Sequence, residues 1–497
     1  MEDPDIIDVL MCGAGAAGLT LAIDLARRGV SFRLIDKLPA PFAGSRGKGI
    51  QPRTLEVFED LGMVDRLFAI GGSYPPQRLH HDDGHHDDMQ GFSVADPTPQ
   101  EPYRMPLMVP QFRTEAVMRE RLAELGHAPE YGRELTGFEE APDHVVAHIA
   151  SDAGPETIRC RYLVGGDGGR SFVRRTLGID FPGKTLGVRA VVADIALDGL
   201  SRDAWHRFND GEMARQLGLC PLPHTDLFQL QAPIAREGAF DLSLTGLQAF
   251  IDDRAPGHGF TVRRVDWAST YEMNARLADR YRDGRVFLIG DAAHTHPPTG
   301  GQGLNTSVQD AYNLGWKLGA VLNGAPETLL DSYEEERRPI AAEMLGLSTR
   351  LLDRARQGEM KRGREVHQLD LAYPDSSLSL NGIGRQGRVM AGDRAPDAAL
   401  QSACGRERQL FDLLRGPHWT AIGYGAAPAT LPAGRPGLHV HHIGPEGALH
   451  DPDKGMATTY GLNNGDLLLV RPDGYVGALV AAGDHARVAA YLHICLA

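Results

Sequence analysis

The sequence predicts an α/β fold of several domains, built around a parallel sheet, and three observations support this prediction. An apolar run of strand length at 6–12 is followed by the glycine-rich turn 13–18 and by a helical pattern over 19–28. A second strand-like run over 30–35 ends in Asp36, which completes a βαβ pattern. Two later apolar runs, 161–165 and 286–289, also end in glycine turns that contain an aspartate.

The composition is that of an ordinary globular protein. The 497 residues are enough for two to four domains, and 42% apolar with 23% charged residues excludes a disordered or fibrous chain. Fifty-one Lys and Arg against 65 Asp and Glu give a net charge of −14, which repels nucleic acid and anionic lipid surfaces. We therefore expect no nucleic-acid or membrane partner, and any anionic cofactor to be held by backbone dipoles and a few arginines.

The cysteines and the first apolar segment bear on localisation. Five scattered cysteines without CxxC spacing favour reduced thiols in a cytoplasmic protein. The apolar stretch 6–26 lacks a basic leader and is interrupted by Asp8, Asp24 and the glycine turn, so we interpret it as neither a signal peptide nor a membrane span.

The turn after the first strand has the GxGxxG pattern, and each glycine has a physical use. Gly13 permits the tight turn, Gly15 lets the backbone approach a pyrophosphate, and Gly18 lets the helix pack closely on the strand. The helix N-terminus stabilises negative charge, and Asp36 can accept both hydroxyls of an adenosine ribose. Because a 2′-hydroxyl is required, FAD or NAD fits better than NADP. The alternative, an ordinary glycine-rich βα turn, is disfavoured because strand, turn, helix, strand and acid are in register.

A second GxGxxG pattern occurs at 382–387, but its surroundings differ. The preceding residues are polar and no helical pattern follows, so we interpret it as a linker. The sequence therefore predicts one Rossmann-type domain rather than the two of reductases that hold FAD and a nicotinamide separately.

Two further strand ends carry aspartates. The run 161–165 leads into Gly166-Asp167-Gly168, and the run 286–289 leads into Gly290-Asp291 and the glycine-rich loop 297–303. The helical pattern 304–323 then begins, and its free N-terminal amides can face an electron-poor ring and stabilise negative charge on it.

These three segments resemble the fingerprints of the class A, single-component FAD-dependent aromatic hydroxylases of the para-hydroxybenzoate hydroxylase type, over residues 5–350. The resemblance implies that Asp291 contacts ribityl hydroxyls and that the amides of Leu304 and Asn305 contact the pyrimidine edge of the flavin. The implied cofactor-binding residues are Gly13, Gly15, Ala16, Ala17, Gly18, Asp36, Lys37, Arg46, Gln111, Asp167, Gly168, Gly290, Asp291, Pro298, Gly301, Gly303, Leu304 and Asn305. Arg46, His294 and Pro298 are the candidates for catalytic roles.

The segments between the fingerprints have a β-rich texture with Asp-Gly and Pro-Gly turns. We interpret 77–104 and 187–274 as an inserted substrate-binding β-sheet domain, which leaves a discontinuous FAD-binding domain of 1–76, 105–186 and 275–387 with long helices. The run His80–Asp88 is rich in His and Asp, yet it flanks an Asp-Gly turn and is typical of a solvated hairpin tip. We expect no functional metal.

Residues 388–497 form a third region. Their opening, Gly392–Asp397, and the hairpin around Arg471–Gly474 resemble the thioredoxin-like tail of the phenol and polyketide hydroxylase branch. Gly425–Pro428 stands where a redox thioredoxin would place CxxC, which excludes thiol exchange. We expect this tail to be structural or to stabilise a dimer, and a homodimer is therefore a possible assembly of the chain.

The function implied by the resemblance is that of a monooxygenase with tight, non-covalent FAD and with NADPH or NADH as a transient co-substrate. One atom of O₂ would enter a small-molecule aromatic substrate, phenolic and multi-ring, through a flavin C4a-hydroperoxide. The motifs leave open a Baeyer–Villiger or epoxidising enzyme of the same fold and a non-catalytic FAD-binding protein. A flavin-dependent halogenase is disfavoured because its Trp-x-Trp-x-Ile-Pro signature is absent.

Overall fold

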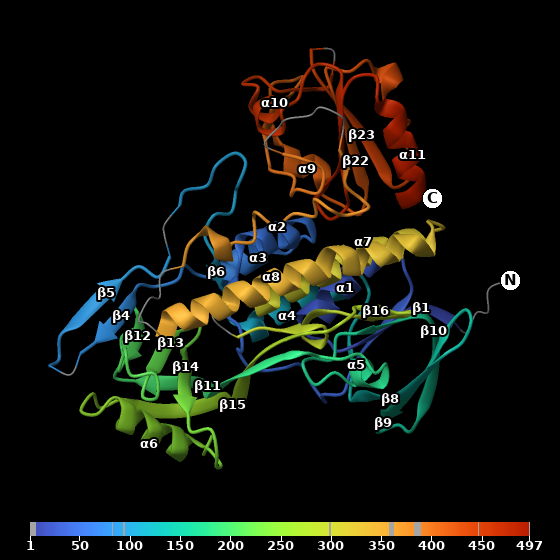
Figure 1. The fold of residues 1–497 in the computed structure, drawn as a ribbon. Helices are drawn as coiled ribbons and strands as arrows, with labels where there is room; N and C mark the ends of the chain where they lie inside the picture. The colour runs from blue at the N-terminus through green and yellow to red at the C-terminus, as the bar shows by residue number, and fades with distance from the viewer. Residues whose placement is uncertain are drawn as a thin grey trace.

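The computed structural model describes residues 6–81, 83–92, 95–297, 300–356, 362–381, 389–445 and 447–496. Three sheets of eight strands each organise the chain, together with a two-stranded ribbon of β3 (Gly49–Ile50) and β6 (Leu107–Met108). In Figure 1 the C-terminal sheet lies at the top, the helices α7 and α8 cross the middle, and the other two sheets lie below them.

The first sheet has a parallel centre. Its strands are β1 (Ile6–Cys12), β2 (Phe32–Asp36), β7 (Glu130–Tyr131), β8 (Arg133–Glu140), β9 (Val145–Ser151), β10 (Glu156–Gly165), β16 (Arg282–Asp283) and β17 (Val286–Leu288). The strands β17, β10, β1 and β2 are parallel neighbours in that order, and their buried centres are continuous apolar runs. Helices cover such a sheet because both of its faces are apolar.

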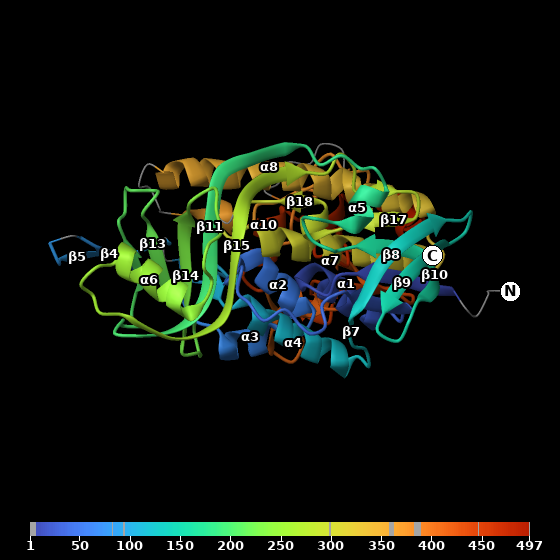
Figure 2. The same ribbon diagram turned by 90° about the horizontal axis from the view of Figure 1, so that it is seen from below.

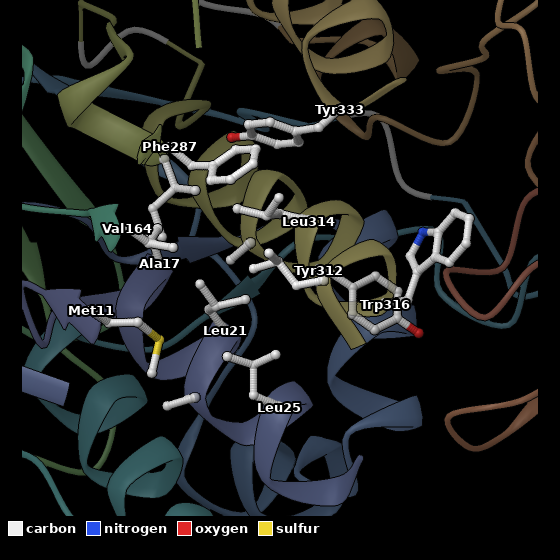
Figure 3. Packing of buried hydrophobic residues seen from close by; sticks show 14 of the residues in the cluster. Met11, Ala17, Leu21, Leu25, Val164, Phe287, Tyr312, Leu314, Trp316 and Tyr333 are labelled. Carbon is white, nitrogen blue, oxygen red and sulfur yellow. The ribbon is translucent and has the colours of Figure 1, made fainter. Parts of the chain in front are cut away.

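Helices from residues 16–176 and 303–356 pack around this sheet. They are α1 (Ala16–Arg27), α2 (Pro52–Asp60), α3 (Val64–Ile70), α4 (Gln111–Glu124), α5 (Phe172–Thr176), α7 (Gly303–Leu322) and α8 (Asp331–Arg356). Figure 3 shows Leu21 and Leu25 of α1 packed toward Leu314 and Tyr312 of α7. The two helices approach closely at Gly315, where an added Cβ atom would lie 2.3 Å from Asp24 Oδ2.

The second sheet is dominated by two long antiparallel strands, β11 (Gly183–Asp198) and β15 (Thr261–Leu277), which curve along the molecule in Figure 2. The other strands are β4 (Gln77–His80), β5 (His86–Met89), β12 (Trp205–Phe208), β13 (Leu217–Pro221), β14 (Leu227–Ile234) and β18 (His294–Thr295). Helix α6 (Leu244–Arg254) packs on this sheet through Leu247 and Ile251.

The third sheet is formed by the C-terminal region. Its strands are β19 (Leu380–Asn381), β20 (Ala399–Ser402), β21 (Glu407–Gln409), β22 (Trp419–Tyr424), β23 (Leu438–Ile443), β24 (Leu449–His450), β25 (Asp466–Val470) and β26 (Val476–Val480), with helices α9 (Leu410–Leu414), α10 (Gly455–Tyr460) and α11 (His485–Cys495). The central strand β22 is parallel to β23 and antiparallel to β25.

A buried charged network joins the third sheet to α7 and α8. Glu336 of α8 accepts hydrogen bonds from Arg471 at 2.6 and 2.8 Å and from Lys317 of α7 at 2.7 Å. Asp473 accepts from Arg471 and from the indole of Trp316, at 2.6 and 3.0 Å. The four charged side chains are at most 1% exposed, so the loop that follows β25 is tied to the helices by fully desolvated ion pairs.

The observed elements match the predicted ones closely where a strong local pattern exists. Strand β1 has the predicted bounds, and α1 and α7 differ from theirs by a few residues. Helix α6 lies in a region that we expected to consist of strands and turns, so that expectation was incomplete. Strands β11 and β15 also run a few residues across the expected limits 187 and 274. The second glycine pattern, 382–387, lies outside the described residues.

In the described part of the chain, every helix is too short or too polar to span a bilayer.

Candidate cofactor site

The carboxyl ends of the four central parallel strands bring the predicted motifs together. Strand β2 ends in Asp36, β1 leads into the glycine turn, β10 leads into Asp167, and β17 leads into Gly290-Asp291. The sheet continues into these turns through backbone hydrogen bonds from Gly166 to Cys12 and from Ile289 to Gly165. Four segments that lie far apart in the sequence therefore meet at one edge, where ligands bind in open α/β sheets.

The three glycines of the first turn have different surroundings. Gly13 has a φ of +107°, and an added Cβ atom would lie 2.3 Å from the carbonyl oxygen of Gly166. At Gly18 the added atom would lie 1.9 Å from the carbonyl oxygen of Gly13. At Gly15 its nearest neighbour is Glu115 Oε1 at 3.9 Å. Gly13 and Gly18 thus permit tight packing, whereas Gly15 presents an open stretch of backbone.

Asp36 is held by the backbone on both sides. Its Oδ2 accepts a hydrogen bond from the amide of Ala14, and its Oδ1 accepts one from Leu38, both at 2.8 Å. Each carboxylate oxygen keeps a further lone pair. The carboxylate is therefore oriented by the glycine turn and can accept two hydroxyl groups, while Lys37 next to it is exposed.

Asp167 combines a structural use with a free acceptor. Its Oδ2 accepts hydrogen bonds from the amides of Phe172 and Val173, at 2.6 and 3.1 Å, and so caps α5. Its Oδ1 is buried and has no hydrogen-bond partner among the described residues. A buried acceptor of this kind is costly unless a ligand satisfies it. Gly168 beside it has a φ of +81° and open space around an added Cβ atom.

Gly290 connects the third motif to the first. It has a φ of +58°, and an added Cβ atom would lie 3.2 Å from Ala17 Cβ and 2.9 Å from Ser307 Oγ. Asp291 is exposed as a whole residue. The surrounding protein raises its pKa, while the charges of His294 and Arg46 act in the opposite direction. Arg46 therefore lies near Asp291, with its guanidinium 5.1 Å from the ring centre of Phe42.

The N-terminus of α7 faces the same region. The helix begins at Gly303, so the amides of Gly303, Leu304 and Asn305 have no acceptor within the helix. The Asn305 side chain fixes the neighbouring segments, because it accepts from the Gln51 amide at 2.8 Å and donates to Gly301 O at 2.7 Å and Gly49 O at 3.0 Å. The Asn305 side chain thus holds the helix start in place, and the contact of the three amides with a flavin stays a prediction.

Gln111 clamps the Arg46 segment to α4. The backbone N–H of Gln111 donates to the carbonyl of Gly47 at 3.0 Å, and its side-chain Oε1 accepts from the backbone N–H of Gly47 at 3.1 Å. Its side-chain Nε2 donates to Glu115 at 2.9 Å. Glu115 was not among the predicted residues. It is buried next to the glycine turn, and its position one helical turn after Gln111 was a usable signal. Burial raises the pKa of Glu115 to about 7, against the hydrogen bond from Gln111.

His294 lies in a buried hydrogen-bonded chain. Its Nε2 is 2.6 Å from Asp310 Oδ2, and its Nδ1 is 3.0 Å from His296 Nε2. Arg337 donates to the other oxygen of Asp310 at 2.8 Å. Burial alone would raise the pKa of Asp310, but the charges of His294 and Arg337 lower it. Both ring nitrogens of His294 are engaged, and its predicted catalytic role stays a prediction.

Two predicted positions need separate comment. Pro298 lies outside the described residues. At the tip of the β4–β5 hairpin, the ligand atoms of His81, His85 and Asp87 lie within 4.8 Å of one another. Two of these residues already interact with each other, since His81 Nε2 is 3.0 Å from Asp87. The absence of a functional metal stays a prediction.

The residues at this edge fit an extended flavin dinucleotide. The backbone is open at Gly15 for a pyrophosphate, Asp36 can bind a ribose, and Asp167 offers an unsatisfied buried oxygen. The amides at the start of α7 can then face the ring. This arrangement defines the class of α/β flavoproteins that bind their cofactor at a parallel-sheet edge.

Comparison with known proteins agrees with that class. The model of the FAD binding domain family matches residues 6–348, and the chain belongs to this family. A flavin-dependent monooxygenase of Mycobacteroides abscessus is 41% identical over 96% of this chain and 97% of its own length. A 6-methylpretetramide 4-monooxygenase of Streptomyces rimosus is 34% identical over 95% and 90%. The solved ternary complex of aklavinone-11 hydroxylase with FAD and aklavinone superposes with a TM-score of 0.82, at 27% identity over the full length of both chains.

These findings confirm the predicted class A flavoprotein family, FAD as the cofactor and a flavin-dependent monooxygenase activity.

The individual contacts to FAD are tested by mutation. We expect Asp291→Ala to weaken FAD binding about tenfold, because a hydrogen bond to a charged group contributes roughly 1.5–3 kcal/mol. Titrating FAD into the apoprotein while following flavin fluorescence measures this. Asp152→Ala, in an exposed turn, is the control, and an Asp291 variant with unchanged affinity would show that the ribityl assignment is wrong.

Proposed function

We propose that the protein inserts one atom of O₂ into a multi-ring phenolic substrate, with NAD(P)H as a transient reductant. The main support is the contact between the second sheet and the segment next to the flavin site. Lys48 donates to Gln229 of β14 at 2.5 Å, and Gln229 donates in turn to the carbonyl of Ser45. A face of the second sheet therefore meets the segment that also carries Arg46. Two relatives named above act on or bind multi-ring aromatic compounds, which supports the substrate class.

FAD, when bound, supplies the hydride acceptance and oxygen activation of this family of reactions. The protein supplies position and electrostatics. The α7 amides of Gly303, Leu304 and Asn305 stabilise negative charge on the ring that faces them, because they are donors at a helix N-terminus without an acceptor inside the helix. The face of the second sheet that carries Gln229 and Asp194, both fully buried, excludes water from the reacting groups.

We further propose that the nicotinamide nucleotide binds transiently rather than in a domain of its own. Within the described residues, one glycine-rich turn joins a strand to a helix in a βαβ unit, and it is the turn at Gly13–Gly18 assigned to FAD. The same surface at the sheet edge would then serve hydride transfer and oxygen chemistry in turn.

The domain division is also part of the proposal: 1–76, 105–186 and 275–387 bind FAD, 77–104 and 187–274 bind substrate, and 388–497 form a thioredoxin-like tail. The order of parallel β22–β23 followed by the antiparallel hairpin β25–β26 and the terminal α11 supports the last assignment. Gly425–Pro428 follows β22, and burial raises the pKa of Cys495 to about 12. We propose a structural tail without thiol chemistry.

Substrate-stimulated turnover tests the proposed reaction. A suitable multi-ring phenol, such as anhydrotetracycline or aklavinone, should accelerate NADPH oxidation by the FAD-loaded protein, and one atom from ¹⁸O₂ should appear in the product. Mass analysis and the position of the new oxygen separate ring hydroxylation from Baeyer–Villiger insertion or epoxidation. Label arriving from water, or NADPH oxidation that no phenol stimulates, would reject the proposal.

A further inference from the structure

Lys48 connects the flavin site to the second sheet. Gly47 and Gly49 on either side of it touch the start of α7: a Cβ atom at Gly47 would lie 4.0 Å from Leu304 Cβ, and Gly49 O accepts from Asn305 at 3.0 Å. The Lys48 side chain turns away from α7 and is 8% exposed, with its ammonium group 2.5 Å from Gln229 Oε1 and 4.2 Å from the ring centre of Trp205. The buried Lys48 side chain thus stands between the start of α7 and the second sheet.

A row of side chains crosses the second sheet beneath the Lys48 side chain. Cys220, Gln229, Asp194 and Trp267 are direct cross-strand partners on β13, β14, β11 and β15, so they share one face. Trp267 packs against Gly44, where an added Cβ atom would lie 2.1 Å from the indole. The row therefore lies directly against the segment 44–48.

Asp194 is the unusual member of this row. It is completely buried, and neither carboxylate oxygen makes a hydrogen bond of good geometry within the described residues. Burial raises its pKa to about 6, although the nearby Ser45 amide and hydroxyl and the charge of Lys48 act in the opposite direction. A buried carboxylate with unused acceptors is costly unless a ligand or another polar group satisfies it.

The surroundings of Lys48 lower the pKa of its side chain. Burial lowers its pKa, and so does the charge of Arg362, whereas Cys220 and Asp194 act in the opposite direction. Among the described residues its hydrogen-bond acceptor is Gln229, so the amine keeps capacity that the protein does not use. A polar ligand group can satisfy both the remaining hydrogen-bonding capacity of the Lys48 amine and the oxygens of Asp194, which have no partner among the described residues.

We propose that Lys48 and Asp194 recognise and ionise a hydroxyl group of the aromatic substrate. The inference rests on the proposed function, because it names the part of the substrate that this site binds. The Lys48 amine takes the hydroxyl proton: the O–H bond breaks, an N–H bond forms, and an aryloxide remains beside the new ammonium group. Asp194 stabilises that ammonium, and the proton returns when the product leaves. The electron-rich aryloxide ring is the better nucleophile for an electrophilic oxygen atom.

The test is a binding measurement on the oxidised, FAD-loaded protein without NADPH, so that no oxygenation takes place. Alizarin and 2-naphthol are the probes, because their absorption spectra change when a hydroxyl ionises. We expect the wild-type protein to bind the aryloxide form at pH values below the solution pKa of the probe. Lys48→Met should lower that affinity roughly tenfold to a hundredfold, as expected for a lost charged hydrogen bond. Asp194→Asn should raise the pH at which the bound probe ionises.

Two variants control for folding and for general charge effects. Lys48→Arg keeps a positive charge and should still bind the aryloxide. If Lys48→Met loses FAD, Lys48→Arg and Asp194→Asn are the variants that test the proposal. Lys184→Met removes an exposed lysine from the same strand as Asp194 and should leave probe binding unchanged. FAD content and thermal unfolding of each variant are measured alongside.

The inference is overturned if the wild-type protein binds neither probe, if the bound probe stays protonated, or if Lys48→Met binds aryloxide as tightly as the wild type. These outcomes are separable from failure of the proposed function. Incorporation of ¹⁸O₂ without Lys48-dependent ionisation would reject the site and keep the monooxygenase reaction. Lys48-dependent ionisation in a protein that oxygenates no phenol would keep the site and reject the reaction.

Discussion

Replacing Gly15 by alanine should leave the protein folded and cost it most of its affinity for FAD, whereas replacing Gly13 should damage the fold itself. At Gly15 an added methyl group meets Glu115 Oε1 at 3.9 Å, an ordinary contact, yet it occupies the backbone surface that a pyrophosphate approaches. We expect FAD affinity to fall at least about tenfold, through loss of a charge-assisted hydrogen bond.

At Gly13 the same methyl group would meet the Gly166 carbonyl at 2.3 Å, in a backbone with a φ of +107°. The loop and strand β10 have to move apart, which we expect to cost about 3 kcal/mol or more of unfolding free energy. Gly126→Ala is the control that separates backbone strain from steric crowding. Gly126 also has a positive φ, +85°, but nothing lies within 4 Å of the added atom. Thermal unfolding of the apoproteins and FAD titrations measure the two effects. A Gly15 variant with wild-type FAD affinity would show that the pyrophosphate lies elsewhere.

The elements and turns of the cofactor site were predictable because their signals are local. The apolar run 6–12 is strand β1 with the same bounds, and Asp36, Asp167 and Asp291 follow directly on strands that proved to be parallel neighbours. A strand end followed by a glycine turn is a pattern of a few residues, so one sequence contains all of it.

The site on the second sheet could not be predicted in that way. Lys48 and Gln229 are 181 residues apart, and Asp194 meets them through strand pairing whose register no short window contains. A lysine between two glycines reads as a surface loop residue until its burial is known. Glu115 and the capping bonds of Asp167 were missed for a different reason. Their partners lie only four and five residues away, but the burial of Glu115 next to the glycine turn is set by the fold.

Glu336→Ala should be among the most destabilising single substitutions outside the cofactor site. It removes the shared carboxylate from Lys317 and Arg471, and both cations are fully buried. An uncompensated buried charge costs about 3–5 kcal/mol. Arg66→Ala, which breaks an ion pair with Glu124 whose members are 39% and 41% exposed, should cost no more than about 1 kcal/mol. Urea unfolding of the FAD-loaded variants measures both.

The pH dependence of the Glu336 effect identifies its origin. Burial alone would raise the pKa of Glu336, but the charges of Arg471 and Lys317 lower it well below its ordinary value. A carboxyl whose pKa is lower in the folded state contributes stability that is complete above its unfolded pKa of about 4.3 and is lost as the pH falls toward the folded pKa. The difference between the wild type and Glu336→Ala should therefore be constant from about pH 5 to neutral and shrink below about pH 4.3. Only the ionised carboxylate of Glu336 can pair with the two cations that join the third sheet to α7 and α8. If the stability difference between the wild type and Glu336→Ala stays unchanged at acid pH, the loss therefore comes from side-chain packing instead.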